Sequence, residues 1–341
     1  FGFQYALGFL LVEELTSILL SLPASRLISR IGFKHSLVLS YFFLLPSLLM
    51  IRWDLTPLLI GTSAMIYSLG KILHGLSIDS EFAVDSHSKK RDSESSKMLG
   101  LPNISRITAP IAGGLILNQF GFNMLITTSI LFFLLSAAVL MKSKDHRDPL
   151  NYDMKSIVKD NYSKTFPVFF ARGILNMAGV TAFALFTFFF IGNEVDAGLV
   201  AAIDNIGLLA VAIISGKLSH KIGRNRIIAI GLIGSSLIHF IRPFAVSSTQ
   251  ALLISGIGGV TFMLYEVPLF SSFANVAEDE DILEFYTAKR ITFKAGQMFT
   301  VLLITLTGLE FGLKQGFQAA FVLAGITSAT AIIWTQKDWT P

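Results

Sequence analysis

Eleven stretches of roughly 20 mostly apolar residues, separated by short polar segments, dominate this chain of 341 residues. An α-helix of that length crosses the hydrocarbon core of a bilayer, and within lipid the backbone must satisfy its own hydrogen bonds. Only 15% of the residues are charged, against about 25% in soluble domains. The sequence therefore predicts an all-α polytopic membrane protein, with spans at about 4–27, 36–52, 56–80, 97–118, 122–142, 166–191, 197–217, 227–246, 249–274, 291–312 and 316–336.

The charges also limit the partners and the chemistry. Most of the 27 Lys and Arg residues fall in loops on one side, which the positive-inside rule assigns to the cytoplasm. The net charge of +4 is then better explained by anionic lipid than by nucleic acid. Cys is absent, and we find no nucleotide-binding loop, metal-ligand spacing or catalytic set. We expect no cofactor and no enzymatic activity.

A short loop pattern occurs twice. The first copy, at 25–34, reads SRLISRIGFK, and the second, at 216–226, reads GKLSHKIGRNR. Gly32 aligns with Gly223, 191 positions later. A turn repeated about half a transporter apart predicts a duplicated half. The candidate gating residues in these loops are Ser29, Arg30, Gly32, Gly216, His220, Lys221, Gly223 and Arg224.

These loops resemble the G-x-x-x-D-R-x-G-R-R loop of the major facilitator superfamily, although Ser29 and His220 replace its Asp. The run KILHG at 71–75 resembles the R-x-x-Q-G of the fourth helix, and SRITAPIAGG at 105–114 resembles a fifth-helix pattern associated with antiporters. The resemblance implies a monomer of two pseudo-symmetric bundles, with twelve helices of which the first precedes Phe1. It places the N-terminal bundle at 1–142, a cytoplasmic linker at 143–165 and the C-terminal bundle at 166–341.

Ionisable residues at bilayer depth mark candidate sites, because a charge there costs several kcal/mol unless it is paired or wet. The offset of 191 also aligns Glu13 with Asp204, and a nearly equal offset aligns His74 with Glu266. A carboxylate facing a central cavity can carry a proton, and His titrates near neutrality. These four residues are the predicted proton-coupling groups.

Other polar residues are candidates for solute contact. Lys71, Arg106 and Arg172 could bind an anion or partner the acids. Arg106 and Lys294 are close enough to the cytoplasmic helix ends to extend their charges to water. The predicted polar lining is Tyr67, Asn176, Asn205 and Tyr265. The alternative is that these acids and bases only neutralise each other as interhelical pairs.

The expected function is secondary active transport of a small organic solute across the inner or plasma membrane of a bacterium. We expect alternating access coupled to protons, with export by exchange favoured over uptake. Two alternatives stay open. One is uptake or uniport of a sugar or an organic anion. The other is a non-transporting membrane sensor or assembly partner built on the same fold.

Overall fold

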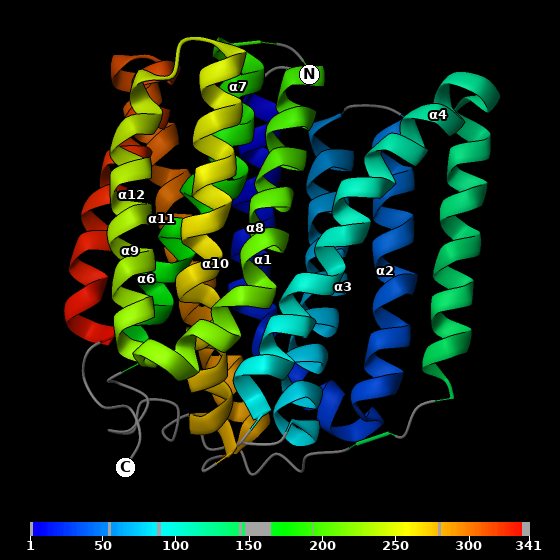
Figure 1. Cartoon of the computed structure of the whole chain (residues 1–341). Coiled ribbons are helices and arrows are strands. Elements are labelled where there is room, and N and C mark those ends of the chain that lie inside the picture. Colours follow the sequence, from blue (N-terminus) through cyan, green and yellow to red (C-terminus); the bar gives the residue numbers. More distant parts are fainter. Residues whose placement is uncertain are drawn as a thin grey trace. The chain divides into compact units, whose positions relative to one another are not determined.

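The computed structural model describes residues 3–53, 56–86, 90–142, 145–146, 165–192, 194–278 and 281–335, and every regular element in these ranges is a helix (Figure 1). The predicted all-α class is confirmed. The elements are α1 (Phe3–Ile31), α2 (Phe33–Trp53), α3 (Pro57–Asp85), α4 (Arg91–Leu140), α6 (Phe166–Asn176), η2 (Met177–Ala182), α7 (Phe183–Phe190), α8 (Glu194–Ile222), α9 (Arg224–Ile241), η3 (Arg242–Phe244), α10 (Ser248–Glu278), α11 (Ile282–Phe311) and α12 (Leu313–Thr335).

Each of the eleven predicted spans lies in these helices to within two residues at its ends, and the last one ends at 336, outside the described residues. Within the described ranges, eight helical stretches are long and apolar enough to cross a membrane. The other three predicted spans lie in α3, in the first arm of α4 and in α8. Both α3 and α8 are helices of 29 residues, long enough to cross the bilayer.

Two local breaks shape the helices. Gly121, with φ 77° and ψ 176°, divides α4 into two arms, which correspond to the predicted spans 97–118 and 122–142. A residue with a side chain is strained at these angles. The predicted span 166–191 contains the π-helix η2, a rare element that often marks a functional position.

The chain forms two compact units. Unit 1 comprises Phe1–Asp85, Gly113–Phe169 and Ala277–Met298, and unit 2 comprises Ser86–Ala112, Phe170–Val276 and Phe299–Pro341. This partition assigns the first arm of α4 to unit 2 and the start of α11 to unit 1. The predicted bundles, 1–142 and 166–341, instead keep all of α4 in the first bundle and all of α11 in the second. That division stays a prediction. Most of the predicted linker at 143–165 lies outside the described residues.

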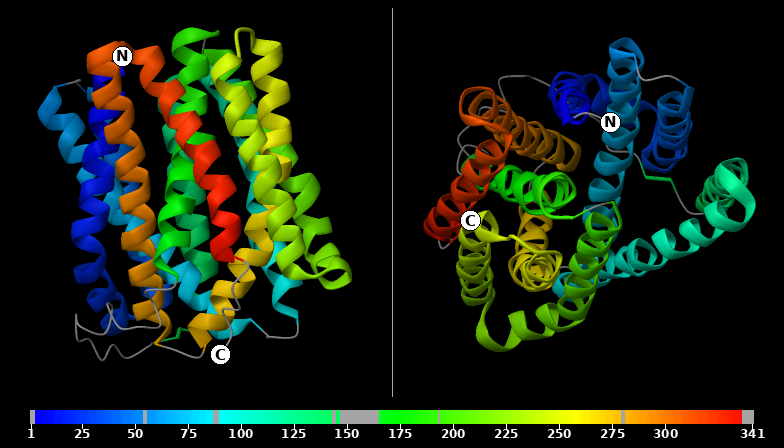
Figure 2. Two further views of the ribbon diagram at one scale, coloured as in Figure 1. Left: turned by 90° about the vertical axis from the view of Figure 1, so that its left-hand side faces the viewer. Right: turned by 90° about the horizontal axis from the view of Figure 1, so that it is seen from above.

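Each unit has its own packing centre. In unit 1, α3 lies between α1 and α2 (Figure 2). In unit 2, α9 lies beside α12, and the α8–α10 contact contains a core of Leu208, Ala212, Met263 and Val267. A Cβ on Gly207 would collide with the Gly256 carbonyl oxygen, and one on Gly259 would collide with the Asp204 carbonyl oxygen. Small residues therefore let these two membrane helices approach closely.

Candidate functional site

Four charged side chains meet among the helices of unit 1. Lys71 of α3 donates to Glu13 of α1 with an Nζ–Oε1 distance of 2.8 Å. Lys294 of α11 lies 3.0 Å from Glu14 and 3.5 Å from the same Oε1 of Glu13. The Ser68 hydroxyl of α3 donates a hydrogen bond to the backbone carbonyl oxygen of Glu13 in α1 at 2.9 Å. Two acids and two lysines thus form one connected group, and we call Glu13, Glu14, Lys71 and Lys294 the unit 1 charge cluster.

Burial makes the partners of this cluster interdependent. Glu13, Glu14 and Lys294 are at most 5% exposed, so each depends on the others for compensation of its charge. Lys294 was expected to extend to water, and that expectation is wrong because its ammonium group is held between two buried carboxylates. The side chain of Lys71 is 41% exposed, although its Nζ is bonded to Glu13. Lys71 is therefore the most accessible member.

Further charged and aromatic side chains of unit 1 lie near this cluster. Lys289 pairs with Asp79 at 2.9 Å, and Lys71 lies 5.2 Å from the centre of the Tyr67 ring. The predicted residue His74 stacks at an angle on Tyr41, with 6.3 Å between ring centres. Arg290 lies against Gly75, which follows His74 in α3. Of the predicted residues, the structure therefore brings Glu13, Lys71, Tyr67 and His74 into one region.

Unit 2 contains a different arrangement. Arg172 of α6 donates two hydrogen bonds to Glu266 of α10, one of them from Nε to Oε2 at 3.0 Å. The guanidinium carbon also lies 5.2 Å from the centre of the Phe273 ring. A two-pronged contact of this kind is geometrically specific and strong. These two predicted residues form a mutually satisfied pair.

Asp204, the predicted counterpart of Glu13, forms no ion pair within the described part of the chain. Arg242 and Arg106 are the cations close enough to act on it electrostatically. Arg242 is buried, donates to the Ala178 carbonyl oxygen of the π-helix at 3.3 Å, and lies 3.2 Å from His239 Nδ1. Arg242 was not among the candidates predicted from the sequence, although it lies within the predicted span 227–246; in the structure it follows α9 directly.

The remaining predicted polar residues are dispersed. Arg106 is exposed and donates to Asn103 at 3.2 Å. Asn205 donates to the Ala201 carbonyl of its own helix at 2.7 Å. Asn176 immediately precedes the π-helix. Tyr265 is buried, with its ring against Phe262. A solute-lining role for these residues stays a prediction.

The two repeated loops share one backbone feature. Gly32 has φ 91° and Gly223 has φ 93°, a region that only glycine enters without strain. The Asp145 carboxylate lies directly over Gly32, accepts from the Lys34 backbone N–H at 3.1 Å and contacts His35 at 2.8 Å. A linker residue thus brings a carboxylate to the loop whose own Asp is replaced by Ser29.

The other gating candidates differ in their contacts. Ser29 bonds back to the Arg26 carbonyl at 2.9 Å, and Arg30 lies with His35 in a surface depression. Lys221 is exposed. Arg224 donates to Asp92 at 2.8 Å within unit 2. Gly216 and His220 lie in α8, and their side chains are outside the described residues.

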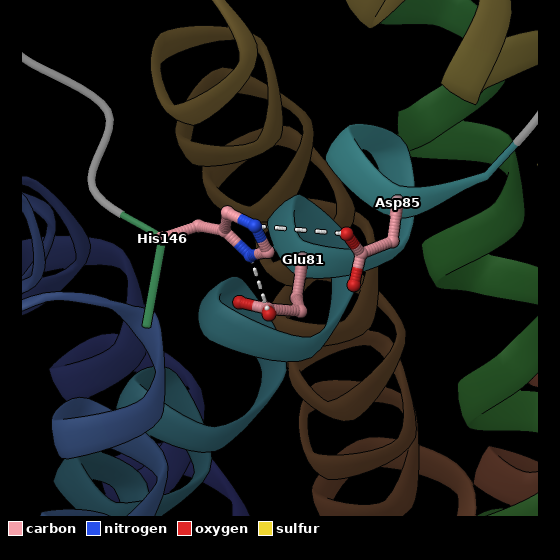
Figure 3. Close-up of side chains that lie close together, drawn as sticks. All are labelled: Glu81, Asp85 and His146. Carbon is pink, nitrogen blue, oxygen red and sulfur yellow. Dashed lines mark hydrogen bonds and ion pairs between the residues drawn. The ribbon is translucent and has the colours of Figure 1, made fainter. Parts of the chain in front are cut away.

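The neighbouring linker residue His146 meets two carboxylates of α3 (Figure 3). Its Nδ1 lies 2.8 Å from Glu81 and its Nε2 lies 3.7 Å from Asp85. The hydrogen bond to Glu81 raises the pKa of His146, and burial raises the pKa of Glu81. The three side chains could hold a metal ion. Because each ring nitrogen faces a carboxylate, the arrangement is better suited to a protonated imidazole, which donates from both nitrogens.

Comparisons with known proteins agree with this architecture. No protein-family model matches the sequence. A Caenorhabditis elegans protein named uncharacterized transporter slc-17.2 is 24% identical over 155 residues, which is 43% of this chain and 29% of that protein. The chain thus matches less than a third of that relative's length.

Solved structures match over almost the whole chain. A bacterial homologue of the iron transporter ferroportin, in an outward-facing state, matches 98% of this chain and 91% of its own with a TM-score of 0.70 and 15% identity. The Escherichia coli fucose:proton symporter matches 98% and 99%, with a TM-score of 0.66 and 10% identity. The chain therefore has the fold of major facilitator superfamily transporters and is an integral membrane protein.

Proposed function

We propose that this protein is a secondary transporter that moves a small organic solute across the cytoplasmic membrane by alternating access. The observation that carries the proposal is the unit 1 charge cluster, buried within helices of a transporter fold. Charges at this depth are costly and are by default functional. The proteins that this chain resembles are named as transporters, but of different cargo, so they leave the solute open.

The cluster has the connectivity that proton coupling requires. Glu13 is bonded to Lys71 and also neighbours Lys294, which is shared with Glu14. When Glu13 takes up a proton, Lys294 keeps a full partner in Glu14, while Lys71 loses its own. Protonation thereby frees the most accessible cation of the cluster. A proton gradient can then bias the alternation, because the two charge states favour different contacts.

Export by proton exchange remains the favoured direction, on the fifth-helix pattern at 105–114. Uptake or uniport of an organic anion is the second candidate, and the excess of basic groups around the cluster favours it. A non-transporting sensor was suggested by the loss of Asp from both repeated loops. The carboxylate of Asp145 over Gly32 weakens that suggestion for the first loop.

The test is flux in proteoliposomes that contain the full-length protein and an internal pH dye, under an imposed proton gradient. A mixed library of drugs, sugars and organic acids is added, and solute-dependent proton movement is expected. Glu13→Gln should abolish this movement. Glu310→Gln is the matched control, because Glu310 is an exposed carboxylate near the end of α11. Solute flux without proton movement would rule out coupling, and no movement of either would favour the sensor.

A further inference from the structure

Around the unit 1 charge cluster, four basic residues lie among three carboxylates. Each of the three carboxylates in this region is bonded to a lysine: Glu13 to Lys71, Glu14 to Lys294 and Asp79 to Lys289. A fourth cation, Arg290, lies among them. It makes no ion pair or hydrogen bond within the described ranges, and its Nε is buried without a hydrogen-bond partner there.

The surroundings of Arg290 do not offer a free partner. Asp79, Glu14 and Glu13 attract it electrostatically, but all three are already bonded to lysines. Lys294 lies four residues later on the same helix face, and like charges at this spacing repel. A desolvated guanidinium without a partner is costly in a protein interior. Among the described residues, the region therefore has one positive charge more than its carboxylates compensate.

Gly75 positions the guanidinium against α3. The Nη1 atom of Arg290 lies 2.6 Å from the position that a Cβ of residue 75 would occupy. Any side chain at this position would displace the arginine, so Gly75 keeps the space beside the helix for it. The residue as a whole is only partly buried, whereas its Nε is buried.

We infer that Arg290 is the main binding group for an anionic solute that carries a carboxylate or a phosphate. The planar guanidinium offers two parallel N–H donors that match both groups. Lys71 supplies a second cation when Glu13 is protonated, since it then has no acid of its own. Proton uptake and anion binding thus favour each other, as co-transport requires, so the inference supports uptake of an organic anion, the second candidate above, over proton exchange. This inference deepens the proposed function by naming its solute class, but it is tested by binding alone.

The experiment measures thermal unfolding of the full-length protein in detergent at constant ionic strength. The probes are gluconate, with glucose as its neutral counterpart, inorganic phosphate, and the lipid phosphatidylglycerol. Gluconate or phosphate should raise the Tm by at least about 2 °C, and glucose should not. Absence of any rise with both soluble anions would overturn the proposal. A rise with phosphatidylglycerol alone would identify a lipid headgroup as the occupant and would also overturn it.

Variants separate binding from folding. Arg290→Gln should lose the anion-induced rise while its ligand-free Tm stays at or above that of the unmodified protein, because no ion pair is broken. Lys314→Gln removes the same charge from an exposed position and should keep the rise. Asp79→Asn frees Lys289 and should lower the anion concentration needed for half of the rise several-fold.

Two outcomes with these variants would contradict the site. One is an undiminished rise in Arg290→Gln. The other is an equal loss in Arg290→Gln and Lys314→Gln, which would indicate non-specific charge screening. Anion binding without flux in proteoliposomes would leave this site in place and would remove the transport proposal instead.

Discussion

The two repeated loops have the same backbone conformation at their glycine but differ in the side chains that contact this glycine. Gly32 and Gly223 share a positive φ that differs by only 2°. The carboxylate of Asp145 lies over Gly32, whereas a Cβ on Gly223 would meet open space. The turn itself is thus the shared element of the two halves. The contact with the linker belongs to the first loop, within the described residues.

The charged centres of the two units have diverged further. Glu13 neighbours two lysines, one of which it shares with Glu14, whereas its counterpart Asp204 has no ion pair in the described part of the chain. Glu266 is bonded only to Arg172 among the described charges, through two hydrogen bonds. Unit 1 contains charges that can exchange partners, and unit 2 contains a mutually satisfied pair. A proton would change the contacts of unit 1 at lower cost, so the coupling group is expected there.

The largest effect is expected from Lys294→Met. Both buried acids lose a cation, and Glu14 loses the only one that lies within ion-pairing distance in the described ranges. Removing one partner of a buried pair costs about 3–5 kcal/mol. The Tm should fall strongly and solute-dependent proton movement should stop. Lys314→Met, at an exposed position, is the matched control. Unchanged stability in Lys294→Met would contradict the shared-cation arrangement.

The pair in unit 2 should behave differently when both partners are replaced. Either Arg172→Met or Glu266→Leu alone should destabilise by about 3–5 kcal/mol, because a buried charge is left unpaired. The double variant should recover most of that loss and keep proton-coupled flux. Thermal unfolding and the pH-dye assay measure the two properties separately. If the double variant is stable and transports solute but no longer moves protons, Glu266 is a proton-coupling residue, as the sequence predicted.

A smaller effect is expected at the repeated glycines. Gly223→Ala should cost about 1–3 kcal/mol from backbone strain alone. Gly32→Ala carries the same strain and also a collision with the Asp145 carboxylate, so it should cost more. The double variant Gly32→Ala/Asp145→Ala should reduce the cost to the level of Gly223→Ala. Equal losses in the two single variants would show that the linker contact contributes nothing.

Local signals allowed much of the fold to be predicted. Span length and apolarity are properties of short segments, and all eleven predicted spans lie in helices to within two residues at their ends. The positive φ of Gly32 and Gly223 is also a property of a short segment, the repeated turn in which each glycine lies. The pairing of charges depends on contacts between distant segments. The contact of Asp145 with Lys34 joins residues 111 positions apart, and no periodicity in the sequence indicates it.

Helix boundaries caused the main omissions at the site. The predicted span began at 291, whereas α11 begins at Ile282, so Arg290 was assigned to a loop. The same error placed Lys294 close to the membrane surface and suggested that its charge reaches water. A helix start several residues earlier moves both side chains into the bundle beside α1 and α3. The acids were easier to find, because a carboxylate within a long apolar run is conspicuous.

The smallest expected effect concerns the linker and sharpens the comparison of the two loops. His146 has a raised pKa because it is bonded to Glu81, so its protonated form favours the docked linker. The docked contact is then fully present below about pH 6.5, the usual pKa of histidine, and is lost as the pH rises through the raised value.

Trypsin can report this change, because Lys144 and Arg147 flank the dipeptide Asp145-His146 in the sequence. Cleavage at these two positions should accelerate as the pH rises above about 6.5, relative to the same measurement on His146→Gln. The pH dependence of trypsin itself affects both proteins equally and therefore cancels in the comparison with the variant. The second repeated loop has no described contact of this kind, so cleavage after Lys221 should follow the same pH profile in both proteins. If the unmodified protein and His146→Gln have the same pH profile of cleavage at Lys144 and Arg147, protonation of His146 does not control docking. The difference between the two loops would then be due to Asp145 alone.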